Sequence, residues 1–163
     1  MPLIVENGTI VTGANTYVSD AEYVAYASAR GLKIGAFGGA REIELFKAMD
    51  YLESHRDQFK GTKVSRDQLL QFPRVSVFID GFQTDSNVIP DLLKKAQMEL
   101  AYQAISINLS PSGSFQNVQS QSLGTMSVSF FNGGSYQGVQ LKSVYVFLNE
   151  LLSNANGNRV IRA

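Results

Sequence analysis

A chain of 163 residues with 44% hydrophobic content is long enough to build one core, which argues against disorder throughout. Lys and Arg together number 14, as do Asp and Glu, so the summed charge gives no long-range attraction to nucleic acid or anionic lipid. This balance still leaves room for a local basic patch. With no cysteine and one histidine, the chain offers no disulfide framework, no thiolate chemistry and few ligands for a metal.

The first residues, MPLIVENGTIV, lack the basic region and long apolar run of a secretory signal. No stretch of the chain reaches the ~18–20 apolar residues that a membrane span requires. Because the absence of cysteine also fits a reducing compartment, we expect a protein that is kept in the cytoplasm until it is used. The length predicts a single domain over residues 1–163. Because no stretch is long and apolar enough to span a membrane, we expect no membrane partner.

The N-terminal segment predicts a short extended region followed by a capped helix. Residues 3–11 are apolar and β-branched around an internal Asn-Gly pair, which predicts a short extended or hairpin-like segment packed over the body. Ser19 and Glu22 have the spacing of a capping box, so we expect a helix over residues 20–30. Gly31 is suited to the left-handed stop that commonly ends such a helix.

Residues 33–40 contain three glycines, which invites comparison with loops that bind phosphate through backbone amides. Such a loop needs Lys followed by Ser or Thr directly after its last glycine, whereas Ala40 and Arg41 follow here. The spacing also differs from the GxGxxG pattern that joins a strand to a helix. The segment therefore predicts a flexible connection between helices and no nucleotide site.

A second helix is predicted over residues 40–56, where apolar residues cover a wide arc. They are Ile43, Leu45, Phe46, Met49 and Leu52. The acidic residues of this segment are interspersed with basic ones, which favours a solvated face over acid/base chemistry. These acids are Glu42, Glu44, Asp50 and Glu53. His55 falls at the C-terminal end of the helix without a nucleophile pattern around it, so we predict no catalytic residue.

The next segment predicts short elements. Ser65 and Gln68 repeat the capping-box spacing, which predicts a short helix through Leu70 that Pro73 ends. Residues 75–79 are predicted to be extended, and the Asp-Gly pair that follows them is a turn signal.

Residues 87–108 form the longest uninterrupted stretch with helical periodicity, and one apolar stripe runs along it. The stripe consists of Ile89, Leu92, Leu93, Ala96, Leu100, Ala104 and Ile107. We expect Leu93, Ala96, Leu100 and Ala104 to be buried. On the opposite side, charged residues in the first turns give way to apolar ones, so the second half is predicted to contact something on two sides. The residues offered for this second contact are Met98, Tyr102 and Ile105.

The C-terminal third predicts a β-hairpin arm, a last helix and a tail. An arm over about 112–136 is expected because Met126, Val128 and Phe130 alternate with polar residues, as in a strand. Leucines at core spacing predict a helix over residues 141–152. The tail over about 153–163 is predicted to be extended and to dock on a partner through its last alternating residues. These are Arg159, Val160, Ile161 and Arg162. The sequence thus predicts a mainly α fold, a small helical bundle around one long central helix, with a protruding β-hairpin arm and an extended tail.

Four stretches carry a family resemblance through their order and spacing. They are Leu3–Thr9 (LIVENGT) with Ala14–Gly31 (ANTYVSDAEYVAYASARG), Leu45–Ser54 (LFKAMDYLES) with Phe59–Gly61 (FKG), Phe72–Arg74 (FPR) with Val88–Ala104 (VIPDLLKKAQMELAYQA), and the leucine-rich last helix with its Gly/Asn tail and final arginine. Together they resemble the head–tail adaptors of tailed phages, also called connector or head-completion proteins. Many members of this family carry the label "putative DnaT-like". The arm departs from the family pattern, because Gln119, Ser120, Gln121 and Ser122 replace the usual charged residues.

The resemblance implies a structural virion protein without enzymatic activity, cofactor or metal. In that family a helical bundle with a β-arm assembles as a ring, usually a dodecamer, beneath the portal protein. The ring extends the channel through which genomic double-stranded DNA passes without sequence-specific binding, and tail or neck proteins dock on it. The protein is then expected in the virion neck, and in the host cytoplasm during assembly. The arm residues Met126, Val128 and Phe130 would contact a neighbouring subunit or a tail protein.

Two features of the residues agree with this implication. A closed ring needs two different contact patches on each subunit, which a helix apolar on two sides and an exposed arm would supply.

The alternative function is a single-stranded DNA-binding replication accessory protein, which would combine basic residues with stacking aromatics. Its candidate aromatics are Tyr17, Tyr23, Tyr26 and Phe37, and its cations are Arg30, Lys33 and Arg41. Core packing explains the helical tyrosines equally well.

Overall fold

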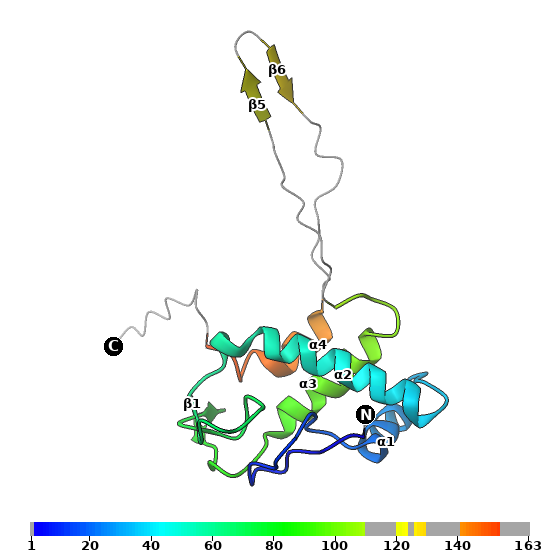
Figure 1. Cartoon of the computed structure of the whole chain (residues 1–163), viewed down its shortest axis with the longest axis vertical. Helices are drawn as coiled ribbons and strands as arrows, with labels where there is room; N and C mark the ends of the chain where they lie inside the picture. The colour runs from blue at the N-terminus through cyan, green and yellow to red at the C-terminus, as the bar shows by residue number, and fades with distance from the viewer. Residues whose placement is uncertain (1, 110–119, 124–125, 130–140, 154–163) are drawn as a thin grey trace.

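The computed structural model describes residues 2–109, 120–123, 126–129 and 141–153, and these ranges contain four α-helices and three antiparallel strand pairs (Figure 1). The helices are α1 (Asp20–Arg30), α2 (Gly38–Ser54), α3 (Asp91–Gln103) and α4 (Lys142–Leu148), with a 3-10 turn, η1 (Arg56–Gln58), after α2. The strand pairs are β1 (Thr62–Lys63) with β2 (Arg74–Val75), β3 (Phe78–Ile79) with β4 (Phe82–Gln83), and β5 (Ser120–Leu123) with β6 (Met126–Ser129). The mainly α fold is confirmed.

The core forms where α3 packs against both α2 and α4. The burial predicted for three residues of α3 and for its C-cap is confirmed, since Leu93, Ala96 and Leu100 are 0% exposed and Ala104 is 5% exposed. The predicted extent of this helix, 87–108, is wrong at both ends. It has 13 residues, and α2 with 17 residues is longer. Pro90 lies outside the helix as its extended N-cap, and the chain turns after Gln103.

Helix α1 begins and ends as its sequence predicts. The Ser19 hydroxyl accepts a hydrogen bond from the Glu22 amide at 3.2 Å, and the Glu22 carboxylate accepts one from the Ser19 amide at 2.8 Å. Gly31 ends the helix with a φ of 64°, a left-handed conformation that glycine adopts without steric cost. Both caps are local, so neighbouring sequence alone specifies them.

Residues 3–11 were predicted to form a short extended or hairpin-like segment, and the structure shows no hairpin there. Its backbone pairs with the chain just before α1: the Glu6 amide donates to the Thr16 carbonyl at 2.8 Å. The Glu6 side chain is buried, and its carboxylate accepts hydrogen bonds from the amides of Gly8, Ile10 and Val11. These amides are therefore not free to form a hairpin ladder with the residues before them.

The region between α2 and α3 corrects a second prediction. Residues 65–70 form turns in place of the predicted helix. One of the two hydrogen bonds of a capping box forms: the Ser65 amide donates to Gln68 Oε1 at 3.1 Å. However, the buried Gln68 Nε2 donates to the carbonyls of Leu70, Gln71 and Pro73, and so fixes the chain in a turn around the side chain.

The predicted turn between residues 79 and 82 is confirmed. Asp80 and Gly81 have φ values of 52° and 85°, and they join β3 to β4 as a two-residue hairpin turn. Positive φ at both positions is the conformation that Asp-Gly favours because it matches the twist of the flanking strands. Strand β2 directly precedes this hairpin among the strands and pairs with β1 through the register Thr62 with Val75 and Lys63 with Arg74.

The last described segment, residues 141–153, contributes buried side chains to the core. Helix α4 is shorter than the predicted 141–152, although Leu141, Val144, Leu148 and Leu151 are buried as expected. After α4 the chain leaves helical geometry, and Leu152 forms an isolated antiparallel bridge with Phe59. This bridge ties the end of the described chain to the segment that follows α2.

Strands β5 and β6 confirm that the predicted arm contains a β-hairpin. Ser120 pairs with Ser129 and Leu123 with Met126, which leaves two residues between the strands. Figure 1 shows this pair apart from the four helices. The predicted arm residue Phe130 and the predicted tail residues Arg159, Val160, Ile161 and Arg162 lie outside the described residues.

Candidate interaction surfaces

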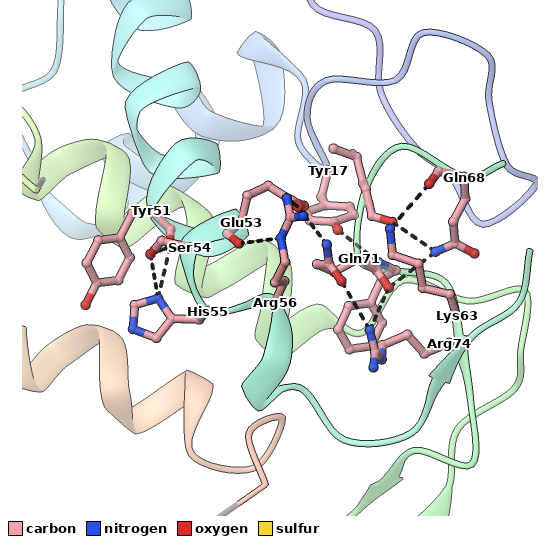
Figure 2. Close-up of polar contacts among 12 residues, drawn as sticks. Tyr17, Tyr51, Glu53, Ser54, His55, Arg56, Lys63, Gln68, Gln71 and Arg74 are labelled. Carbon is pink, nitrogen blue, oxygen red and sulfur yellow. Dashed lines mark hydrogen bonds and ion pairs between the residues drawn. The ribbon is translucent and has the colours of Figure 1, made fainter. Parts of the chain in front are cut away.

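A network of polar side chains joins the end of α2 to the segment that contains β1 and β2 (Figure 2). Arg74 is 8% exposed and donates to the carbonyls of Phe59, Lys60 and Gly61 at 3.3, 2.8 and 2.7 Å. It also donates to Gln71 Oε1 at 3.3 Å. Burial lowers the pKa of Arg74. This cation is used to hold the backbone and offers little to an external phosphate.

The same network reaches the N-terminal segment. The Gln71 amide group donates to Glu53 Oε2 at 2.7 Å, and the Phe72 amide donates to the Tyr17 hydroxyl at 3.0 Å. Burial raises the pKa of Tyr17, so its phenol is neutral at ordinary pH. The other oxygen of Glu53, Oε1, is buried with no partner among the described residues. These hydrogen bonds hold three chain segments together, so the network has a structural role.

The acidic residues of α2 do not all form the solvated face that was predicted. Glu44 is 9% exposed and accepts hydrogen bonds from the Tyr23 hydroxyl at 2.9 Å and the Gly35 amide at 3.1 Å. Glu53 is half-buried in the network described above. The prediction is wrong for these two residues because each one satisfies donors on a neighbouring segment, which charge alternation along one helix does not reveal. Burial and the hydrogen bond to Glu44 raise the pKa of Tyr23.

His55 lies where α2 ends. Its Nδ1 is 3.0 Å from both the Ser54 hydroxyl and the Tyr51 carbonyl oxygen, and its ring centroid is 4.7 Å from that of Tyr51. These contacts with the last turn of α2 account for the position of His55 and require no catalytic role. Within the described ranges, no three His, Cys, Asp or Glu side chains gather where they could hold a metal ion. None of the helices described there is long and apolar enough to cross a membrane.

The predicted second contact face of α3 is only partly at the surface. Met98 is 8% exposed and belongs to the core of the chain itself, whereas Tyr102 is half-buried and Ile105 is 47% exposed. Ile105 lines a pocket of about 350 Å³ between the middle of α2 and the turn after α3. The lining includes Lys47 and Asp50 of α2 and residues 104–109. A contact to another protein through this face would rest on Ile105 and Tyr102.

The aromatic residues named for single-stranded DNA are mostly buried. Tyr17, Tyr23 and Tyr26 are 1%, 0% and 7% exposed, so their rings are not available to stack on bases. Phe37 is 68% exposed and remains a candidate. Arg41, one of the named cations, holds Asp20 through two hydrogen bonds of 2.6 and 2.8 Å.

Exposed apolar side chains mark surfaces that the sequence patterns missed. Half of the ten large hydrophobic residues that are exposed within the described part of the chain fall between residues 64 and 88. They are Val64, Leu69, Phe78, Phe82 and Val88. A signal was present in the sequence, because a hairpin of two-residue strands cannot bury both of its faces, and its two phenylalanines flank the Asp-Gly turn. At the other end of α2, Val24, Phe37 and Ile43 are also exposed.

The described residues thus define a small, mainly α-helical protein with a β-hairpin and exposed apolar side chains at its surface. The chain belongs to the family described as "Putative DnaT-like ssDNA binding protein", whose model matches residues 1–163. No curated protein matches the chain, and no solved structure matches it.

Proposed function

We propose that this protein is a structural subunit of a phage head–tail junction. It forms a ring beneath the portal protein, joins the head to tail or neck proteins, and extends the channel for genomic DNA. The ring is proposed to be a dodecamer in the virion neck, built from subunits made in the host cytoplasm. In this proposal α3 is the central helix of the bundle, and the protein performs no catalysis and needs no cofactor.

The observation that carries the proposal is the contrast between the helices and the β5–β6 hairpin. The helices pack on one another, whereas β5 and β6 pack chiefly with each other (Figure 1). A two-stranded hairpin is at best marginally stable alone in water, so it gains most when a partner covers it. A subunit that offers its hairpin to a neighbour, through Met126, Val128 and Phe130, fits a ring protein. The exposed Ile105 and the half-buried Tyr102 supply a further contact.

A deletion of residues 115–131 tests this role. Because the described core is formed by other residues, the shortened chain should fold with an unfolding temperature close to that of the full chain. It should fail to assemble into a ring. Loss of folding would place the hairpin in the core and contradict the proposal.

The C-terminal residues are proposed to bind the portal protein. Arg159 and Arg162 flank two β-branched residues, a pattern that can pair with carboxylates while the backbone adds to an exposed strand edge. A chain that ends at Ser153 should keep the folded body, which includes buried Leu151 and Leu152, but should yield heads that lack tails. Normal head–tail joining by this truncated protein would exclude portal docking by the tail.

Single-stranded DNA binding is the second candidate function, and the family description favours it. One observation on this chain agrees: the exposed Phe37 follows two exposed cations, Arg30 at the end of α1 and Lys33 in the connection between α1 and α2. Stacking on an aromatic ring beside cations is the usual chemistry of such binding. Titration of a fluorescent oligothymidine at low and physiological salt tests it. Tight binding that Phe37→Ala weakens would support this function over the adaptor.

A further inference from the structure

Two groups of exposed apolar side chains lie at opposite ends of α2. The first group, Val24, Phe37 and Ile43, is 39%, 68% and 56% exposed where α1 meets the start of α2. The second group, Phe78, Phe82 and Val88, is 51%, 79% and 43% exposed on β3, β4 and the loop before α3. Burial of such side chains is favourable at about 25 cal/mol per Å² of apolar surface, so each group gains by meeting a partner.

The distance between the groups follows from the helix that separates them. Helix α2 has 17 residues, which corresponds to roughly 25 Å at 1.5 Å per residue. Phe37 directly precedes α2, whereas β3 and β4 follow from the segment beyond its C-terminal end. In that segment Gly61 packs against Val75 and Val77, on the stretch that leads from β2 to β3. A side chain at residue 61 would collide with the Val75 carbonyl oxygen. Figure 1 shows α1 and β1 at opposite ends of the body.

The two groups lie in chain segments of opposite charge. Residues 23–40 contain Arg30 and Lys33 and no acidic residue, and both cations are exposed. Residues 75–93 contain three aspartates and no Lys or Arg, and all three are exposed. We call the first surface, Val24, Phe37 and Ile43 with Arg30 and Lys33, the basic end. The second, Phe78, Phe82 and Val88 with Asp80 and Asp85, is the acidic end. The neutral total charge of the chain conceals this asymmetry.

Other charges near the basic end are accounted for inside the chain. Asp20 is bound to Arg41, and Glu22 is paired with Lys94 at 3.4 Å. Glu44 is buried against Tyr23, and the half-buried Glu99 accepts a hydrogen bond from the Tyr26 hydroxyl at 3.3 Å, beneath the ring on which Arg30 lies. This leaves the half-buried Glu42 as the acid beside Ile43. At the acidic end, Asp80 and Asp85 form no ion pair with another described residue. Phosphates would be repelled there, so exposed Phe78 and Phe82 are poorly suited to stack on nucleic acid.

We propose that the acidic end of one copy of this chain binds the basic end of the next copy. Apolar contact would supply affinity, and the opposite charges would exclude pairing of like ends. A contact between two different surfaces of identical subunits continues from copy to copy, and it closes into a ring when the rotation permits. The inference rests on the proposed ring and assigns two further surfaces that, together with the hairpin, are needed to build it.

Two variants, each with one damaged end, test the proposal by native mass spectrometry and light scattering. Phe37→Asp places an acid at the basic end, and Phe82→Asp places a further acid at the acidic end. Phe37→Asp keeps an intact acidic end, and Phe82→Asp keeps an intact basic end. Val146→Asp is the matched control, because Val146 is 69% exposed on α4 and belongs to neither surface. Unfolding temperatures of all three variants should stay close to that of the unmodified chain, since the substituted side chains are exposed.

The unmodified chain and Val146→Asp should form assemblies whose masses are multiples of 17.8 kDa. Each damaged variant alone should stay a single chain. An equal mixture of the two should give dimers with one copy of each, because only one intact pair of unlike ends remains. The inference is overturned if either damaged variant assembles normally, if their mixture stays monomeric, or if the unmodified chain is monomeric at every concentration. The chain that ends at Ser153 is assayed by head–tail joining, so that experiment tests the proposed function separately from this inference.

Discussion

The helical core and the segment that contains β1 and β2 are held together by different interactions. In α3, fully buried Leu93, Ala96 and Leu100 pack among other apolar side chains. In the segment between α2 and α3, buried Arg74 and Gln68 hold the backbone through carbonyl oxygens. Apolar packing follows from a repeating sequence pattern, whereas a polar network depends on which carbonyls the fold brings to one side chain.

The largest effect is expected in the helical core, from Leu100→Ala. The side chain is 0% exposed, so its removal should lower the free energy of unfolding by about 2–5 kcal/mol through lost burial and a cavity. Chemical denaturation measures this. Val146→Ala, at an exposed site on α4, should change stability by less than about 0.5 kcal/mol. A loss below about 1 kcal/mol for Leu100→Ala would contradict its place in the core.

The network around Arg74 is the next most sensitive point. Arg74→Met should lower the free energy of unfolding by roughly 2–4 kcal/mol, because buried carbonyl acceptors lose their donors. Arg74→Lys should recover little of this, since one ammonium group cannot reproduce the planar fork that bonds the carbonyls of Phe59, Lys60 and Gly61. Denaturation of both variants decides the matter. Full stability of the lysine variant would show that charge alone matters.

The same contrast explains how much the sequence could predict. Local patterns were sufficient for α1, where Ser19, Glu22 and Gly31 are neighbours in the chain. They were also sufficient for the buried face of α3. They failed for Ser65 and Gln68, because the buried Gln68 side chain bonds Leu70, Gln71 and Pro73, and for Glu44, whose donors come from α1 and the glycine-containing connection.

The predicted interaction residues divide in the same way. Helical spacing placed Met98 on a second face, yet neighbouring elements cover it in the folded chain. The exposed Phe37, Phe78 and Phe82 were not singled out as protein contacts, because exposure at the end of a domain is a property of the tertiary fold. The contacts proposed for the arm and the tail stay predictions.

The two serines with capping-box spacing offer a direct comparison of one pattern in two settings. Ser19→Ala should cost about 1 kcal/mol of stability, because it removes the acceptor for the first turn of α1. Ser65→Ala should cost less, since the Ser65 hydroxyl accepts from the Asp67 amide in a turn and caps no helix of the described chain. Equal losses in denaturation would show that the helix termini are not what distinguishes the two sites.

A smaller effect is expected from the ion pair that joins α1 to α2. The hydrogen bond from Arg41 lowers the pKa of Asp20 below its ordinary value. Since the folded pKa is lower than the unfolded pKa of about 4, the pair stabilises the fold above that pH. This stabilisation is lost as the pH falls through the folded pKa.

Unfolding measured against pH for the unmodified chain and for Asp20→Asn checks this sign. The two proteins should differ in stability at neutral pH and converge in acid. The difference should shrink as salt is added, because the Asp20 side chain is 37% exposed and partly screened. A difference that grows toward acid pH would contradict the assignment.

The central claim is that this chain is an assembling structural subunit, and the mass of the purified protein, alone and mixed with the portal protein of the same phage, tests it most directly. We predict assemblies of several 17.8 kDa chains and a complex in which they bind the portal ring. A single chain at every concentration, with or without the portal protein, would contradict the claim.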